Sequence, residues 1–155
     1  MKPIKYFFLF TIFVGIVACH QNEVYFQYRP VPAKGWDKDS LLVFEYDIQD
    51  TVSKYDVFVH VRHYGNYPYQ NFWLFMQNTD VNGNTSKDTI ECYLADDYGK
   101  WLGTGNVIKE MPIYYKQQIS LPDSGTYHMT IGHGMRDSLL VGIKEIGVRV
   151  EKSVD

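Results

Sequence analysis

The sequence predicts an all-β protein that folds as one antiparallel β-sandwich of about eight strands. Three observations favour this class. Aromatic residues make up 16% of the 155 residues, with 13 tyrosines, and aromatic side chains favour strands. Several short segments alternate apolar and polar residues, and turn residues such as Gly, Pro, Asn and Asp separate them. The mature chain has no convincing amphipathic helix.

Eight segments carry the strand pattern, in the order 24–29, 41–48, 55–62, 72–77, 88–95, 113–121, 126–133 and 139–152. The first alternates weakly and stops at Pro30, which indicates an edge strand. The second and third have period two, so one face of each is expected in the core and the other face of the third mostly in solvent. The fourth is apolar on both faces, which favours a central strand.

The later segments repeat the alternation: Ile90, Cys92 and Leu94 share one face, and Ile146, Val148 and Val150 share another. Residues 32–39 are expected to form a loop around Trp36. The long connection from Asp96 to Met111 suits Greek-key crossings, so a jelly roll is the first prediction. An immunoglobulin-like sandwich is the alternative, although the cysteine pair and central tryptophan of that fold are missing.

The N-terminus resembles a bacterial lipoprotein signal. Lys2 and Lys5 precede an apolar run from Tyr6 to Ala18, and Ile16-Val17-Ala18-Cys19 ends it in small residues before a cysteine. Thirteen residues span about 20 Å as a helix, which is too short for a permanent membrane span. We therefore expect a removed signal peptide at 1–18, a lipidated tether at 19–23 and a single domain at 24–155. An ordinary secretory signal is the alternative.

Lipidation of Cys19 would attach the protein to the membrane. The three acyl chains typical of a bacterial lipoprotein give stable attachment, whereas a single chain gives only marginal binding. The next residue is His20. An Asp at this place marks inner-membrane retention in well-studied bacteria, so its absence favours the outer membrane. Cys92 is then the one remaining thiol, and its apolar flanks predict that it is buried and unreactive.

The charge argues against a nucleic-acid partner. The formal net charge is −3, and loss of Lys2 and Lys5 leaves 13 basic against 18 acidic residues, or −5. No cofactor or metal site is predicted: His60 and His63, and His128 and His133, have spacings that do not share one face of a strand. No phosphate-loop, dinucleotide or G-x-S-x-G motif occurs.

Two stretches are candidates for binding. Residues 96–105 combine Asp96 and Asp97 with Lys100 and Trp101, which could bind Ca²⁺ or stack on a sugar ring. The alternative is a turn, with two glycines as a flexible connection and Trp101 capping one end of the sandwich. In the second stretch, Tyr67 and Tyr69 suit a protein or glycan interface, or fold back over the core.

The segment from about Tyr67 onward resembles the GldH family of gliding-motility lipoproteins of Bacteroidetes. The residues that carry the resemblance are 67–75 (YPYQNFWLF), 88–91 (DTIE), 94–96 (LAD), 99–105 (GKWLGTG), 133–136 (HGMR), 142–143 (GI) and 147–152 (GVRVEK). It implies a non-enzymatic, lipid-anchored envelope protein associated with the gliding machinery and its protein partners, and it carries over no catalytic residue.

The shared polar residues are expected to form a common surface or a structural lock: Asp96, Lys100, Trp101, His133 and Arg136. In this hypothesis Arg136 pairs with Asp96 or Asp97 and pins two loops together. The leading functional prediction is a binding scaffold of the motility or surface-secretion apparatus. A cell-surface carbohydrate-binding module centred on Trp101 is the alternative, and a lipid-anchored hydrolase is a weaker one.

Overall fold

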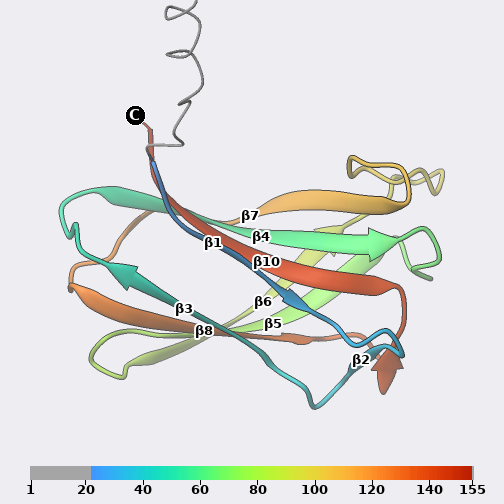
Figure 1. Cartoon of the computed structure of the whole chain (residues 1–155), viewed down its shortest axis with the longest axis horizontal. Helices are drawn as coiled ribbons and strands as arrows, with labels where there is room; N and C mark the ends of the chain where they lie inside the picture. The colour runs from blue at the N-terminus through green and yellow to red at the C-terminus, as the bar shows by residue number, and fades with distance from the viewer. Residues whose placement is uncertain (1–21, 155) are drawn as a thin grey trace, which may run out of the picture.

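The computed structural model describes residues 22–154, which contain ten strands and no helix (Figure 1). The strands are β1 (Glu23–Pro30), β2 (Trp36–Asp37), β3 (Leu42–Ile48), β4 (Lys54–Tyr64), β5 (Asn71–Thr79), β6 (Thr85–Tyr93), β7 (Ile108–Ser120), β8 (Gly125–His133), β9 (Leu139–Leu140) and β10 (Ile143–Lys152). Within this range no helix has the length and apolarity to cross a membrane. The predicted signal peptide and Cys19 lie outside the described residues.

The eight longer strands form two antiparallel sheets that face each other (Figure 1). The first sheet has the order β1-β10-β4-β7 and the second has the order β3-β8-β5-β6. The chain changes sheets at every connection between these strands except the β5–β6 hairpin. This is the double Greek key of a jelly roll, so the predicted fold class is confirmed.

The inner faces of the two sheets form the core that the alternation predicts. Phe44, Tyr46 and Ile48 of β3 are buried, and Val43 and Glu45 between them are exposed. The inward residues of β5, β8 and β10 follow the same rule. The strand β5 lies between β8 and β6, which confirms its central place.

Three expectations from the sequence are wrong. The second face of β4 is not mostly in solvent: Phe58 and His60 are buried there, because side chains from β1 and β10 lie over them. The long connection after β6 is shorter than expected, since β7 already begins at Ile108. The loop around Trp36 contains the short strand β2, which pairs with β9.

The sandwich has two distinct ends. At the tether end, β1 begins beside the last residues of β10, and the Lys152 amide donates to the Asn22 carbonyl at 2.7 Å (Figure 1). The β5–β6 turn and the turn before β8 meet at this end, through Asn82 and Asp123. At the opposite end, which we call the motif end, lie the loops 31–35, 65–70, 94–107 and 134–142.

Candidate functional site

Five of the segments singled out in the sequence lie at or run into the motif end: 67–75, 94–96, 99–105, 133–136 and 142–143. Segment 88–91 lies within β6, and 147–152 runs along β10 to the tether end. The Leu94 amide donates to the Gln70 carbonyl at 2.8 Å, and the Gly134 amide donates to the Trp73 carbonyl at 2.7 Å. These bonds join the loop before β5 to the loop after β6, and β5 to the end of β8. Segments far apart in the chain therefore build one end of the molecule.

Asp96 shapes a tight hairpin tip. Its carboxylate oxygen Oδ1 accepts hydrogen bonds from the backbone amides of Tyr98 and Lys100, at 3.0 and 2.9 Å. Asp97 and Lys100 are exposed at the tip. This is the chemistry of an Asx turn. No cluster of three His, Cys, Asp or Glu side chains suited to a metal occurs among residues 22–154.

The glycines of the GTG sequence have a structural role that differs from a flexible turn. A Cβ atom at Gly103 would lie 2.7 Å from the Glu110 carbonyl oxygen, and one at Gly105 would lie 2.1 Å from the Ile108 carbonyl oxygen. Thr104 between them exchanges two backbone hydrogen bonds with Glu110. The loop folds directly onto the backbone of β7, and only glycine permits that approach.

Trp101 packs against the end of the sandwich. Its ring meets the buried His63 ring edge-on at a centroid distance of 4.6 Å and lies 6.5 Å from the ring of Tyr67. Tyr67 is buried as well, and its hydroxyl donates to the Asn71 carbonyl at 2.9 Å. Trp101 and Tyr67 therefore cap the core, and the Trp101 ring is not a free platform for a sugar.

His133 and Arg136 do not form the predicted lock. His133 is buried, and its Nε2–H donates to the Trp36 carbonyl at 3.2 Å. Arg136 is exposed, and no ion pair within residues 22–154 joins it to Asp96 or Asp97. The predicted pair does not form; backbone hydrogen bonds instead join Leu94 to Gln70, in the loop before β5, and Gly134 to Trp73 of β5.

A surface depression brings two of the predicted residues together. Tyr69 and Arg136 line a hollow of about 460 Å³ with Trp73 and Gly134. The Tyr69 hydroxyl donates to Asp137 Oδ2 at 2.7 Å, which holds the ring at the rim. Tyr, Trp and Arg are the side chains most enriched at protein-binding hot spots. The sequence did not identify Trp73 as a surface residue of this site.

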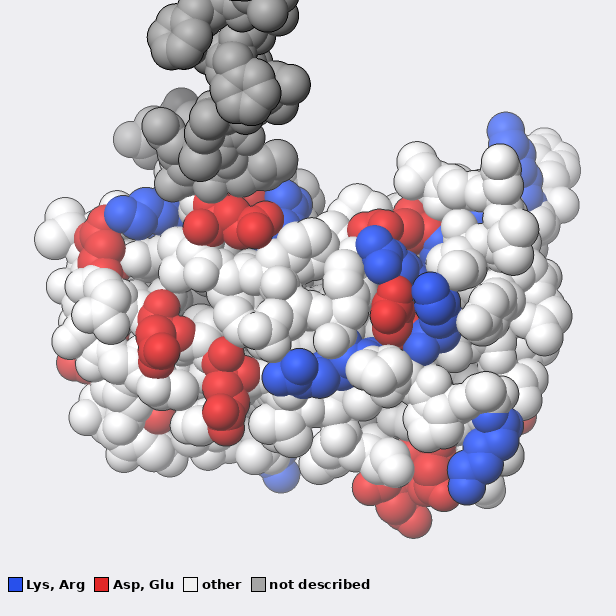
Figure 2. All heavy atoms as spheres, in the orientation of Figure 1, with Lys and Arg blue, Asp and Glu red and all other residues white. Residues whose placement is uncertain are grey.

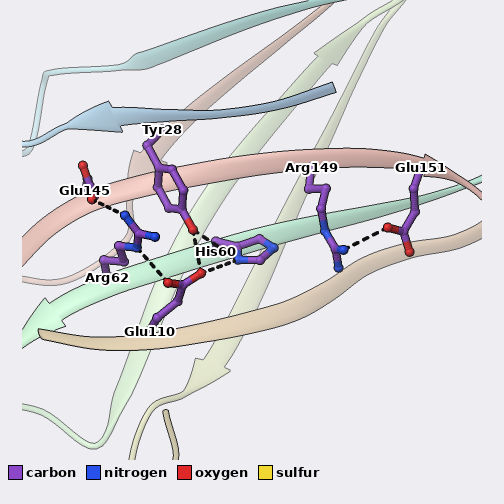
Figure 3. A network of polar contacts seen from close by, with 7 residues as sticks. All are labelled: Tyr28, His60, Arg62, Glu110, Glu145, Arg149 and Glu151. Carbon is purple, nitrogen blue, oxygen red and sulfur yellow. Dashed lines mark hydrogen bonds and ion pairs between the residues drawn. The ribbon is translucent and has the colours of Figure 1, made fainter. Parts of the chain in front are cut away.

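A polar network on the outer face of the first sheet was not predicted. Glu110 of β7 accepts hydrogen bonds from the Tyr28 hydroxyl at 2.6 Å and from Arg62 Nε at 2.9 Å, and its Oε1 lies 3.1 Å from His60 Nδ1 (Figure 3). Arg62 also donates to Glu145 at 2.8 Å. The network joins all four strands of the sheet. Only the strand order reveals it, since its members are scattered along the chain.

The protonation states in this network follow from its geometry. Burial lowers the pKa of His60, so the ring is neutral at pH 7. Burial raises the pKa of Glu110, but the hydrogen bonds from Tyr28, His60 and Arg62 outweigh it, and the net pKa lies below the usual value. His60 therefore donates its Nδ1–H to an ionised Glu110. Its Nε2 atom is buried without a partner, and the His60 ring packs against the ring of Phe26 at a centroid distance of 4.7 Å.

A cleft of about 410 Å³ opens between the sheets near the tether end. Its polar groups bind one another: the Tyr115 hydroxyl donates to Asp88 and accepts from Asn78, and Lys116 lies 3.1 Å from Asp88. These contacts leave few groups to recognise a ligand. On the side of the molecule shown in Figure 2, acidic and basic side chains are interspersed, and neither sign covers a continuous area.

The sequence profile of the family described as GldH lipoprotein matches residues 23–150, which extends over nearly the whole described sandwich. The chain belongs to the GldH lipoprotein family. A gliding motility lipoprotein GldH homolog from Christiangramia forsetii is 34% identical over 156 aligned positions, which cover 96% of this chain and 94% of that protein. The gliding motility lipoprotein GldH of Flavobacterium johnsoniae is 32% identical, over 88% of this chain and 89% of the relative.

Among solved structures, the VP2 subviral particle of infectious bursal disease virus is similar with a TM-score of 0.38 and 13% identity. The match covers 84% of this chain and 31% of the viral chain. The strand orders β1-β10-β4-β7 and β3-β8-β5-β6 identify this GldH-family chain as a jelly roll.

Proposed function

We propose that this protein is a non-catalytic scaffold of the gliding machinery, anchored through a lipid on Cys19 to the outer membrane and bound to other envelope proteins. Membership of the GldH lipoprotein family carries this proposal. Most of the segments that resembled the family in the sequence lie at or run into the motif end, opposite the start of β1, although 147–152 extends along β10 to the tether end. That arrangement supports a protein held at one end and binding at or near the other.

The short tether limits where the domain can be. Four residue steps separate Cys19 from Glu23, the first residue of β1, and a fully extended chain covers about 14 Å in that distance. The tether end would therefore stay against the membrane. A strand of ten residues such as β10 is about 33 Å long, so the motif end would project away from the lipid surface.

Two observations favour a non-catalytic role. Burial raises the pKa of the Cys92 thiol to about 12, so the thiol is not a nucleophile at neutral pH. The His60–Glu110 pair has the elements of a general base, but the free His60 nitrogen is enclosed and cannot reach a substrate. Both the Cys92 thiol and the His60 ring are therefore enclosed in the fold.

The proposal is tested by deleting the gene in the native bacterium and restoring it as wild type or Cys19→Ser. Wild type should incorporate labelled fatty acid, fractionate with the outer membrane and restore cell movement over a surface. The Cys19→Ser protein should lose the label and the membrane fraction. Movement that is unchanged by deletion, or fatty-acid labelling that persists in Cys19→Ser, would contradict the proposal.

A further inference from the structure

The outer face of the second sheet carries an apolar surface near the motif end. Leu41 is 60% exposed, Phe75 is 52% exposed and Tyr93 is 61% exposed. Val43 and Trp73 are exposed beside them. We call these five residues the Phe75 face. Large apolar side chains grouped in this way on one side of a sheet mark an interaction site more often than scattered ones do.

Strand pairing makes the Phe75 face continuous across the sheet. Phe75 of β5 lies opposite Gly132 of β8, and the Leu41 side chain lies over the same glycine, 2.9 Å from where its Cβ would be. A Cβ at Gly134 would lie 3.1 Å from both Trp73 and Phe75. Gly132 near the end of β8 and Gly134 just after it therefore leave the backbone without side chains there, and Leu41, Trp73 and Phe75 cover it.

Two depressions lie on the Phe75 face, and Phe75 lines one of them. One has a volume of about 340 Å³ and is lined by Leu41, Lys87 and Thr130 together with Phe75 itself. The other is the 460 Å³ hollow lined by Trp73 and Arg136. Each is large enough for one or two apolar side chains. An extended chain that crosses Phe75 would place side chains in both, because alternate residues of a strand point the same way.

The charges around this face select the partner. Glu91 accepts hydrogen bonds from Asn71 and Tyr93, at 2.7 and 3.1 Å, and Asp137 accepts one from Tyr69. Asp88 is paired with Lys116 at 3.1 Å. Arg136 and Lys87 instead make no side-chain hydrogen bond or ion pair within residues 22–154. Glu91 and Asp137 keep their negative charge, but neutral donors already bind their oxygens, whereas the Arg136 and Lys87 donors are free to bind a partner although the whole chain has a net charge of −3.

We propose that the Phe75 face binds an extended segment of a partner protein that carries apolar side chains and at least one carboxylate. The apolar side chains enter the two depressions beside Phe75, and Arg136 and Lys87 bind the carboxylates at either end. An arginine fork binds a carboxylate through two parallel hydrogen bonds, which fixes the direction of the segment. This inference rests on the proposed function and deepens it, since it names the surface and the chemistry of the partner.

A protein segment fits the surface better than a glycan does. Sugar sites combine an aromatic ring with polar groups that are free to bind hydroxyls, but here Glu91 and Asn71 bind each other. Leu41 and Val43 add aliphatic surface that a sugar ring does not use. Rigid aromatics beside an arginine instead match the composition of protein-binding hot spots.

The test is photo-crosslinking in the native bacterium with the full lipidated protein. Benzoylphenylalanine replaces Phe75 in one strain and Tyr114 in a matched control. Tyr114 is 56% exposed on the outer face of the first sheet, so it is equally able to react. After irradiation, mass spectrometry identifies the crosslinked peptide. We expect a protein adduct from position 75 that is absent from position 114, with Asp or Glu in the crosslinked segment.

Charge reversal provides the second arm. Arg136→Glu should reduce the adduct from position 75 at least fivefold, and Lys87→Glu should reduce it to a smaller extent. Neither side chain supports the fold, so the melting temperature should be unchanged. The inference is overturned if position 75 gives no adduct, an adduct with glycan or lipid, a peptide without a carboxylate, or an adduct whose yield is insensitive to Arg136→Glu.

These failures are distinguishable from failure of the proposed function. Fatty-acid labelling at Cys19 and loss of movement on deletion do not depend on the Phe75 face. If those results hold while position 75 gives no protein adduct, the scaffold binds its partner through another surface. If deletion leaves movement intact, the proposed function fails even when a crosslinked partner is found.

Discussion

Tyr28 donates a 2.6 Å hydrogen bond to Glu110 from the opposite edge of the same sheet. The two residues lie on β1 and β7, with β10 and β4 between them. Gly147 of β10 makes this reach possible, because a Cβ there would lie 2.7 Å from the Tyr28 ring. Arg62 covers the other side of the ring, with its guanidinium carbon 3.9 Å from the ring centroid. The two edges of the sheet are thereby linked through side chains.

Removing the Tyr28 hydroxyl should destabilise the protein. Tyr28→Phe keeps the ring over Gly147 but removes one donor to the ionised Glu110, and a hydrogen bond to a charged group contributes about 1.5–3 kcal/mol. Because Glu110 keeps Arg62, we expect a loss of about 1–2 kcal/mol in urea unfolding. Tyr114→Phe is the control, since its hydroxyl makes no hydrogen bond within residues 22–154. Equal stability of the two variants would show that the Tyr28 bond contributes nothing.

Replacing Gly147 with alanine should destabilise the protein, which is the opposite of the usual effect of a glycine-to-alanine change inside a strand. Alanine normally stabilises the interior of a strand relative to glycine. Here the added methyl would push the Tyr28 ring away from β10 and break its bond to Glu110, so Gly147→Ala should cost about 1–3 kcal/mol. Gly65→Ala is the matched control, because nothing lies within 4 Å of its Cβ position. A stabilised Gly147→Ala variant would contradict the arrangement of Tyr28.

Stability should fall as the pH drops below about 6.5. Burial lowers the pKa values of His60, His63 and His133 in the folded state. The unfolded chain therefore binds protons first, and the stability that neutral histidines provide is present above pH 6.5 and lost as the pH falls toward the folded pKa values. Each histidine contributes a slope of at most about 1.4 kcal/mol per pH unit.

The check is a series of urea-unfolding curves between pH 7.5 and 5. This window lies above the unfolded-state pKa of carboxyl groups, near 4, so Asp50, Asp88 and Glu110, whose folded pKa values are lowered, contribute below it. A His133→Gln variant should show a shallower slope than wild type, whatever its absolute stability. A flat profile for wild type would contradict the assignment of buried neutral histidines.

The period-two pattern predicted the inward face of the strands because that face depends only on the strand's own alternation. It failed for the outward face of β4, where Phe58 and His60 are buried. Their cover comes from Phe26 and Arg149, on strands that the sequence does not place next to β4. Gly105 shows the same limit, since the Ile108 carbonyl that excludes a side chain there is a contact of the folded loop.

Two of the candidate residues named from the sequence, Tyr69 and Arg136, line one depression although they are 67 positions apart in the chain, and its role in binding stays a prediction. The predicted ion pair between Arg136 and Asp96 is not formed, because the presence of opposite charges in a sequence does not tell which loops face each other. Trp73 and Phe75 made β5 apolar on both faces, which correctly indicated a central strand. That pattern does not tell whether the second apolar face is covered, and in residues 22–154 it is exposed.

Trp101 decides between the binding and structural explanations of the GKWLGTG segment. Its ring packs on His63 and Tyr67, so Trp101→Ala should lower the free energy of unfolding by roughly 2–3 kcal/mol, less than the loss for a fully buried aromatic. Tyr98→Ala is the control, because Tyr98 is 97% exposed at the same hairpin tip and should change stability by less than about 0.5 kcal/mol. The protein adduct at position 75 should persist in Trp101→Ala, measured below its melting temperature. If Trp101→Ala instead kept full stability and lost binding to a glycan array that wild type binds, the ring would be a ligand platform and the capping role would be wrong.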